Sequence, residues 1–450
     1  MFSLPSDSPG ENQIISGCFQ QPSAACWKMH AAILPHGEQL MSIYLHISHP
    51  SPVSIWGMTS GERIERLLGL SVIPVGQESL ASLPPEDSVL LIRGDYLFDD
   101  RLIKHLGATP ALLLQLDAPG QRIVAAHVAA GQAMEALALL DADDTGVAVP
   151  AAMLGDVQVS TPADISVHFQ SKLRKSEAAF VLPITARSKA ALEQRLFDWS
   201  YKGVTDLVTK WVWPWPARHV VAWCVRRRFT PNQVTFTGFL LVLFAGICFA
   251  NGFYAFGLLA GWLMTFLDTV DGKLARVTLT SSRFGHYFDH IIDILHPPLW
   301  YMLWGLGLPT ALAAGLSMPL TAYFWLLLIF YIGGRLVEGS FQWVLGRFGI
   351  FCWQPFDSYF RLITARRNPS LILLTASLLI GRPDLGLVTV TAGTVLSTIL
   401  LFARLIYAVK VRRATKKPLR SWLLDVDSPP YAHTLAARIF TGRARQNAGP

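Results

Sequence analysis

The chain has 450 residues, enough for two or three domains, and it is 52% hydrophobic and only 15% charged. This balance, with a mean hydropathy of +0.37, argues against an ordinary soluble protein and for a membrane protein. The net charge of +7 is uneven, because residues 1–200 hold 13 Lys and Arg against 21 Asp and Glu, whereas residues 201–450 hold 25 against 10. Since the basic half is also the apolar half, we expect membrane lipids and phosphate-bearing substrates as partners, and no nucleic acid.

A soluble α/β domain is predicted over residues 53–199, after an N-terminal extension of residues 1–52. Short apolar runs typical of strands alternate here with polar, helix-like stretches. The expected strands cover residues 53–58, 88–95, 111–117 and 178–184. Alternation of strands and helices predicts a parallel sheet with crossover helices.

Residues 200–232 are predicted to form an interfacial juxtamembrane helix. Tryptophans and basic residues alternate there and an apolar run follows directly, a pattern typical of a helix at a membrane surface. The residues concerned are Trp211, Trp213, Trp215, Trp223, Lys210, Arg218 and Arg226. The alternative is a Trp-rich helix of a protein core.

Residues 233–410 contain six apolar segments that predict six transmembrane helices. They lie at roughly 234–250, 253–275, 284–306, 319–339, 369–381 and 385–409. Six spans put both ends of this domain on one side, where Lys and Arg concentrate, and the positive-inside rule makes that side cytoplasmic. We therefore expect a multi-pass protein of the cell (inner) membrane, with the α/β domain and a basic tail of residues 411–450 both in the cytoplasm.

Four aspartates stand at membrane depth, and they are the only acidic residues between Asp206 and Glu338: Asp268, Asp271, Asp289 and Asp293. Ionisable residues within membrane segments are rare and usually functional. The spacings of three and four residues put each pair on one face of its helix. Because the connection between the second and third spans is short, those helices should be antiparallel neighbours, so the four carboxylates are expected to converge.

Converging carboxylates repel one another unless a cation lies between them. Ligands that are all oxygen favour Mg²⁺, Mn²⁺ or Ca²⁺ over zinc, and carboxylate-bound Mg²⁺ commonly contacts substrate phosphates. Gly272 and Ala275 leave room for a flat group such as a nucleotide, while Lys273 and Arg276 offer charge to phosphates. This combination indicates phosphoryl transfer.

The eight fixed positions Asp268-x2-Asp271-Gly272-x2-Ala275-Arg276-x8-Gly285-x3-Asp289-x3-Asp293 resemble the signature of the CDP-alcohol phosphotransferases. The segment TPNQVT at 230–235 is also similar to the family's entry into its first span. The resemblance covers roughly residues 200–410. It implies an integral membrane enzyme of phospholipid synthesis with six membrane helices.

The resemblance also implies residue roles. Asp268, Asp271 and Asp289 would hold one or two Mg²⁺ or Mn²⁺ ions, with Asp293 as a further ligand. Asp293 would also take the proton of the acceptor hydroxyl. The catalytic residues would be Asp293 and Asp289. The CDP pocket would be shaped by Asn232, Asp268, Gly272, Ala275, Arg276 and Gly285. The hydroxyl would attack the phosphorus that carries the non-nucleotide alcohol, and CMP would leave.

Basic residues at the cytoplasmic ends of the fourth and fifth spans predict an acceptor site: Arg335, Arg366 and Arg367. An arginine cluster suits an anionic acceptor group such as a phosphate, although the positive-inside rule accounts for it equally well. The stretch TARRNP is similar to family members that join CDP-inositol to inositol phosphate, or CDP-diacylglycerol to a phosphorylated polyol. The expected donor is therefore CDP-diacylglycerol or a CDP-polyol.

The N-terminal domain resembles a degenerate nucleotidyltransferase, the cytidylyltransferase that precedes the membrane part in the inositol members. SIWGMTSGERIERLLG resembles a strand and nucleotide-binding loop, but the tight glycine spacing and the following lysine are absent. Asp95, in LLIRGDYLFDD, stands where such folds place a metal-binding carboxylate. We expect a regulatory or interaction domain.

Two rival hypotheses stay open at this point. One is a bifunctional cytidylyltransferase and phosphotransferase of the inositol-phosphate type, which makes its own CDP-alcohol. The other is a non-catalytic membrane scaffold or transporter, against which the four aspartates argue. Family members often form dimers, so a homodimer is a further expectation.

Overall fold

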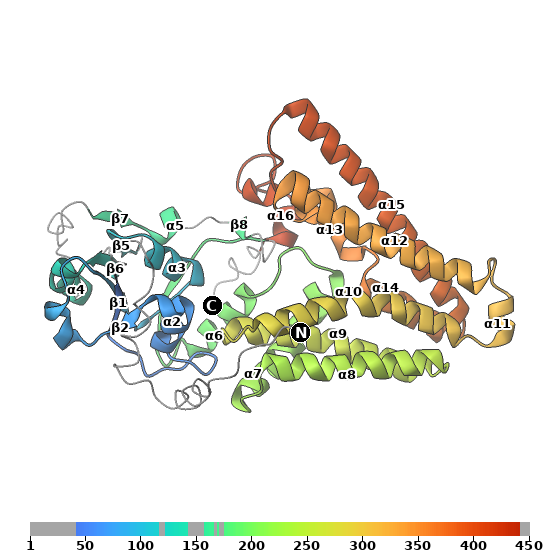
Figure 1. Cartoon of the computed structure of the whole chain (residues 1–450), viewed down its shortest axis with the longest axis horizontal. Helices are drawn as coiled ribbons and strands as arrows, with labels where there is room; N and C mark the ends of the chain where they lie inside the picture. The colour runs from blue at the N-terminus through green and yellow to red at the C-terminus, as the bar shows by residue number, and fades with distance from the viewer. Residues whose placement is uncertain (1–41, 117–121, 143–156, 166–168, 171–174, 442–450) are drawn as a thin grey trace, which may run out of the picture. The chain divides into compact units, whose positions relative to one another are not determined.

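The computed structural model describes residues 42–116, 122–142, 157–165, 169–170 and 175–441. It contains an N-terminal α/β region followed by a helical region (Figure 1). The predicted combination of a soluble α/β part and an α-helical membrane part is thus present in outline. Most of the predicted N-terminal extension lies outside the described residues.

The α/β region is built on a six-stranded mixed sheet with the order β2-β1-β3-β6-β5-β7. Its strands are β1 (Ile43–Ser48), β2 (Ile73–Pro74), β3 (Ser88–Arg93), β5 (Leu112–Gln115), β6 (Ile123–Ala129) and β7 (Gln158–Ser160). Smaller ladders pair β4 (Tyr96–Phe98) with β10 (Val181–Pro183) and β8 (Phe169–Gln170) with β9 (Lys175–Ser176).

The prediction of a parallel sheet is wrong at one strand. β6 runs antiparallel to both β3 and β5. Only residues 116–122 connect β5 to β6, and a parallel crossover needs a dozen or more residues, so the two strands must return antiparallel. The apolar run at 123–129 was not predicted as a strand.

The start of the sheet also differs from the prediction. The strand expected at 53–58 is a turn closed by a bridge between Ile55 and Met58, and Trp56 and Gly57 have positive φ. The first strand is β1, ten residues earlier in the sequence, inside the predicted N-terminal extension. Its run IYLHIS alternates less clearly than a half-buried strand because β1 packs between two parallel neighbours.

Helices cover both faces of this sheet. Leu90 and Ile92 of β3 pack toward α2 (Ser60–Leu68) and α3 (Asp100–Ala108), whereas Val89 and Leu91 pack toward α4 (Ala133–Asp141). Successive side chains of a strand point to opposite faces, so β3 is buried on both sides. The short α5 (Pro162–Ile165) and then α6 (Lys189–Trp199) complete the region.

The junction is helical, as predicted for an interfacial segment. A π-helical turn over Val208–Val212 leads into α7 (Pro214–Arg226). Trp211, Trp215 and Trp223 expose about half or more of their surface, whereas Trp213 packs edge-on against Trp262 and Phe266. The exposed tryptophans suit a membrane interface.

The helical region contains a helix at each of the six predicted spans. They are α8 (Pro231–Ala250), α9 (Tyr254–Val277), α10 (Arg283–Leu306), α12 (Leu320–Ser340), α14 (Arg367–Leu379) and α15 (Pro383–Thr415). All six contribute to one apolar core that includes Phe249, Trp300, Tyr323, Leu371 and Val390. The short α11 (Thr310–Ala314) and α13 (Pro355–Ile363) lie between them in the chain.

Three helices of the described chain are long and apolar enough to cross a membrane: Pro231–Ala250, Leu320–Gly346 and Pro383–Thr415. By this measure six spans are not established. Two of the remaining helices carry the four aspartates, and α14 has only 13 residues. Charges needed for a site lower the hydropathy of the helices that bear them.

Candidate functional site

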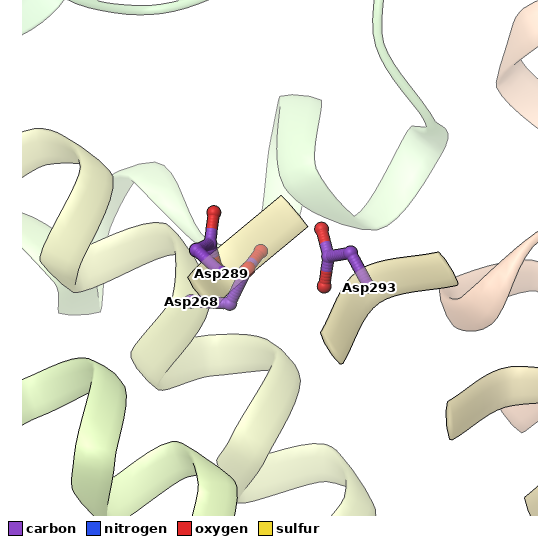
Figure 2. A group of neighbouring side chains, drawn as sticks. All are labelled: Asp268, Asp289 and Asp293. Carbon is purple, nitrogen blue, oxygen red and sulfur yellow. The ribbon is translucent and has the colours of Figure 1, made fainter. Parts of the chain in front are cut away.

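Three of the predicted aspartates come together at the facing ends of two helices. Asp268 lies in the second half of α9, and Asp289 and Asp293 lie one turn apart in the first half of α10. One carboxylate oxygen of each lies within 4.8 Å of the others (Figure 2). All three side chains are half-buried and offer oxygen atoms only, so the chemistry of this donor set fits a hard divalent cation such as Mg²⁺ or Mn²⁺.

Asp271 takes a different place from the other three. Its Oδ2 atom accepts a hydrogen bond of 2.6 Å from the Thr235 hydroxyl on α8. Asp271 nevertheless lines the same small pocket as Asp268, Asp289 and Thr235. The sequence predicted that four carboxylates would converge; the structure gathers three within bonding reach of one ion and holds the fourth beside them.

Arg367, at the start of α14, contacts the aspartate cluster directly. Its Nη1 atom donates to Asp293 Oδ1 and its Nη2 atom donates to Asp268 Oδ2, each at 2.5 Å. The sequence assigned Arg367 to an acceptor site because it follows Arg366. The helical start of α14 separates the two side chains, so that Arg367 faces the carboxylates and Arg366 does not.

The predicted nucleotide-binding residues surround the short connection between α9 and α10. Ser282, the N-cap of α10, donates to Asn232 at 3.1 Å and accepts from the Gly285 backbone at 2.9 Å. A Cβ atom at Gly285 would overlap Asn232 Oδ1, so any larger residue there would displace the Asn232 side chain from its present position. Gly272 is less constrained, since its Cβ would lie 3.1 Å from the flexible Arg276 guanidinium.

Arg276 offers an unused donor close to these residues. Its Nε atom is buried and has no hydrogen-bond partner among the described residues. A buried donor without a partner is costly, so a bound anion would stabilise it. Lys273, by contrast, is buried against the rings of Phe197 and Tyr201.

A second cluster of charges lies at the far end of α12. Glu338 forms ion pairs with Arg335, at 2.7 Å, and with Arg366. The Arg366 Nε atom is buried without a hydrogen-bond partner in the described part of the chain. Two of the three predicted acceptor-binding arginines thus share one carboxylate.

Asp206, in the juxtamembrane segment, holds Asn368, which lies two residues after Arg366 in the chain. Its carboxylate accepts from Asn368 at 2.9 Å and from the Thr209 backbone at 3.0 Å. Burial opposes its ionisation, but the charge of Arg361 and these hydrogen bonds outweigh burial and hold the pKa of Asp206 below its usual value.

The N-terminal residues singled out in the sequence are already paired. Arg93 donates to both Asp95 oxygens, at 2.9 and 2.6 Å, so this carboxylate is neutralised by a cation of the protein. Arg63, in the predicted nucleotide-binding stretch, is buried and donates to Asp100 and to the Val277 carbonyl. These pairings leave neither residue arranged for a nucleotide.

The aspartate cluster lies in a segment that matches a known protein family. Residues 228–343 match the family model of CDP-alcohol phosphatidyltransferases, and this range contains all four aspartates. Over these residues the chain is similar to this family. The match does not extend to the N-terminal domain, whose likeness to a nucleotidyltransferase it leaves unconfirmed.

Three known proteins are similar to parts of this chain. An archaetidylinositol phosphate synthase of Pyrococcus horikoshii is 44% identical over 15% of this chain and 35% of its own length. A cholinephosphotransferase 1 of Xenopus laevis is 29% identical over 25% of this chain and 29% of its own length. A bifunctional IPC transferase and DIPP synthase of Thermococcus kodakarensis is 32% identical over 17% of this chain and 21% of its own length. The alignments thus span about a third or less of each relative.

Thr235 and Ser282 are polar residues of the site that sequence analysis did not single out. Thr235 is the last residue of the TPNQVT segment, whose first residue, Thr230, forms a capping box with Gln233 at the start of α8. Ser282 is recognisable as an N-cap, because serine followed by a helix is typical of one. Neither pattern reveals that these hydroxyls face Asp271 and Asn232.

Proposed function

We propose that this protein is a membrane CDP-alcohol phosphotransferase that transfers a substituted phosphate group from a CDP-alcohol to an acceptor hydroxyl and releases CMP. The convergence of Asp268, Asp289 and Asp293 within the family match carries this proposal. A scaffold or transporter has no need of three carboxylates held together beside a buried, unpartnered arginine donor.

The roles of the residues follow from their positions. Asp268 and Asp289, with Asp271 beside them, would hold Mg²⁺ or Mn²⁺, as one ion or two. A divalent cation bound there supplies positive charge at the pyrophosphate of the donor. Asn232, Gly272, Ala275, Arg276 and Gly285 would enclose the CDP group, with Arg276 donating to a phosphate oxygen.

Asp293 is proposed as the general base. One of its oxygens is held by Arg367, which orients the carboxylate and leaves the other oxygen for the proton of the acceptor hydroxyl. The hydroxyl oxygen then forms a bond to the phosphorus that carries the alcohol, and the bond from that phosphorus to the CMP oxygen breaks. Arg276 would stabilise the departing CMP by donating to its phosphate, and Asp289 would contribute by holding the divalent cation.

The acceptor is proposed to carry a phosphate. Arg335 and Arg366 share Glu338 as their carboxylate, and the unused Arg366 Nε is a donor for an anion. The donor would be CDP-diacylglycerol or a CDP-polyol. A relative named archaetidylinositol phosphate synthase agrees with this substrate class.

The proposal includes a membrane arrangement. The six helices α8, α9, α10, α12, α14 and α15 would all span the inner cell membrane, with both termini cytoplasmic and membrane lipids around the exposed apolar faces. A homodimer is part of the proposal by analogy with the family. The domain limits proposed from the sequence stand at 200–232 for the interfacial helix and 233–410 for the membrane domain.

The decisive experiment screens acceptors for CMP release. Protein purified in detergent is supplied with Mg²⁺ or Mn²⁺, CDP-diacylglycerol, and glycerol phosphate, inositol, inositol phosphate or serine in turn. We expect acceptor-dependent CMP release that chelation abolishes and that Asp289→Ala lacks. Asp384→Asn is the matched control, because Asp384 pairs with Arg382 at the start of α15 and should leave the rate unchanged. Absence of release with every donor and acceptor would refute the proposal.

A further inference from the structure

The C-terminal segment folds back onto the helical region. We name residues 419–441 the C-terminal cap. Its apolar residues Leu419, Trp422, Leu423, Val426, Ala436, Ala437 and Phe440 are buried. They share one core with Phe341 and with residues 350–353, which precede α13. The basic tail predicted from the sequence therefore contains a packed segment that includes α16 (Leu435–Phe440).

Hydrogen bonds fix this cap to residues 351–358. The Ser421 hydroxyl donates to the Cys352 carbonyl at 2.6 Å, and the Trp422 backbone donates to the Trp353 carbonyl at 3.3 Å. The Trp422 indole donates to the Ser358 hydroxyl at 3.0 Å, which itself donates to the Phe351 carbonyl at 2.8 Å. Trp422 is therefore held at both its backbone and its ring.

Phe351 is the link from the cap to the proposed acceptor site. Its buried ring lies 5.5 Å from the Arg361 guanidinium carbon and 5.6 Å from that of Arg366. Arg366 in turn pairs with Glu338. A guanidinium near an aromatic ring gains from the contact, so the position of Phe351 helps to set where both arginines lie.

We propose that the C-terminal cap positions Arg361 and Arg366 for an anionic acceptor. Trp422 and Ser421 are positioning residues, because they act through Phe351 and do not touch substrate. The aspartate cluster and the predicted CDP pocket are built from α8, α9, α10 and α14, whereas Ser421 and Trp422 hydrogen-bond to residues 352, 353 and 358, which belong to none of these helices. This inference rests on the proposed function and assigns the cap to one of its two substrates.

The test compares Trp422→Ala with wild type in CMP release. We expect the KM for inositol phosphate to rise about tenfold, because a displaced Arg366 would lose a hydrogen bond to the charged acceptor. The KM for the CDP-alcohol should stay unchanged. The KM for unphosphorylated inositol should also stay unchanged. Trp422→Phe keeps the ring but loses its N–H, so it should show a smaller rise in the same constant.

Controls separate positioning from loss of fold and from lipid contact. Thermal unfolding of Trp422→Ala reports any general loss of stability, which would lower activity with all substrates alike. Lys417→Ala removes an exposed charge just before the cap and should change neither KM. An equal rise in both KM values, or no rise in Trp422→Ala, would overturn the inference.

A binding measurement keeps the test independent of turnover. Calorimetry with inositol phosphate alone should show affinity about tenfold weaker for Trp422→Ala than for wild type. If wild type binds neither inositol phosphate nor glycerol phosphate, there is no anionic acceptor site to position and the inference fails. CMP release with inositol or serine would then still support the proposed phosphotransferase.

Discussion

At the residue scale, the site depends on hydroxyls and glycines as much as on carboxylates. Thr235 donates to Asp271, and Ser282 joins Asn232 to the backbone of Gly285. These contacts orient groups that would otherwise rotate freely. Partners of this kind typically matter almost as much as the metal ligands that they hold.

Thr235→Val should lower CMP release about tenfold or more, with a higher concentration of Mg²⁺ needed for half-maximal rate. The substitution keeps the shape of the side chain but removes the hydroxyl that donates to Asp271. Metal titrations of the rate measure the effect. Thr235→Ser retains the hydroxyl and should behave like wild type; equal behaviour of the valine and serine variants would contradict the role of this hydrogen bond.

Gly285→Ala should abolish or nearly abolish activity. The new Cβ would overlap the Asn232 Oδ1 and Ser282 Oγ atoms, so these side chains, one of them in the proposed CDP pocket, must move from their present positions. Gly393→Ala is a matched control within α15, because its Cβ would make only ordinary contacts at 3.9 Å. Size-exclusion chromatography first shows that both variants are folded. Their rates of CMP release are then compared, and equal rates would contradict the prediction.

At the scale of elements, helix ends bring the site together. The second half of α9 and the first half of α10 carry the aspartates, and α14 begins with Arg367 directly over them. Asn368 fixes the start of α14 to the juxtamembrane segment, because its amide donates to Asp206 at 2.9 Å and to the Thr209 hydroxyl at 3.1 Å. The first residues of α14 are therefore anchored on both sides.

Asp206 should make stability depend on pH in the acidic range. Its pKa is lowered in the folded protein, so its contribution is fully present above the pKa of the unfolded chain, about 3.9, and is lost as pH falls through the lower folded value. Asp206→Asn should be less stable than wild type at neutral pH and should lose less stability on acidification. Thermal unfolding between neutral and acidic pH tests this, and parallel curves for both proteins would exclude the effect.

At the scale of the whole molecule, the N-terminal α/β domain and the helical domain differ in how their acids are used. Asp95, the acid of the first domain that was predicted as a site residue, pairs with Arg93, whereas Asp268 and Asp293 share Arg367 and lie beside Asp289. Among the described residues, a gathering of three carboxylates therefore distinguishes the helical region. We place the proposed phosphotransfer there, where the family match also lies.

Asp95→Ala should leave CMP release unchanged, because Arg93 already neutralises this carboxylate and no substrate depends on it. The same protein should form no CDP-alcohol from CTP and a phosphorylated alcohol. Release of pyrophosphate from CTP reports that second activity. If wild type releases pyrophosphate and Asp95→Ala does not, the protein is the bifunctional enzyme.

The sequence by itself determined the class of the protein and its central motif. Apolar segments predicted all six helices of the second half, because a long apolar segment must be buried in lipid or in a protein core, whichever residues surround it. The spacing of Asp289 and Asp293 predicted that these two side chains share one face of their helix. Only the tertiary structure decided where β1 begins, that β6 runs antiparallel, that Arg367 reaches the carboxylates, and that the basic tail becomes a packed cap. These features depend on contacts between residues far apart in the chain, and local patterns of hydrophobicity and charge do not record them.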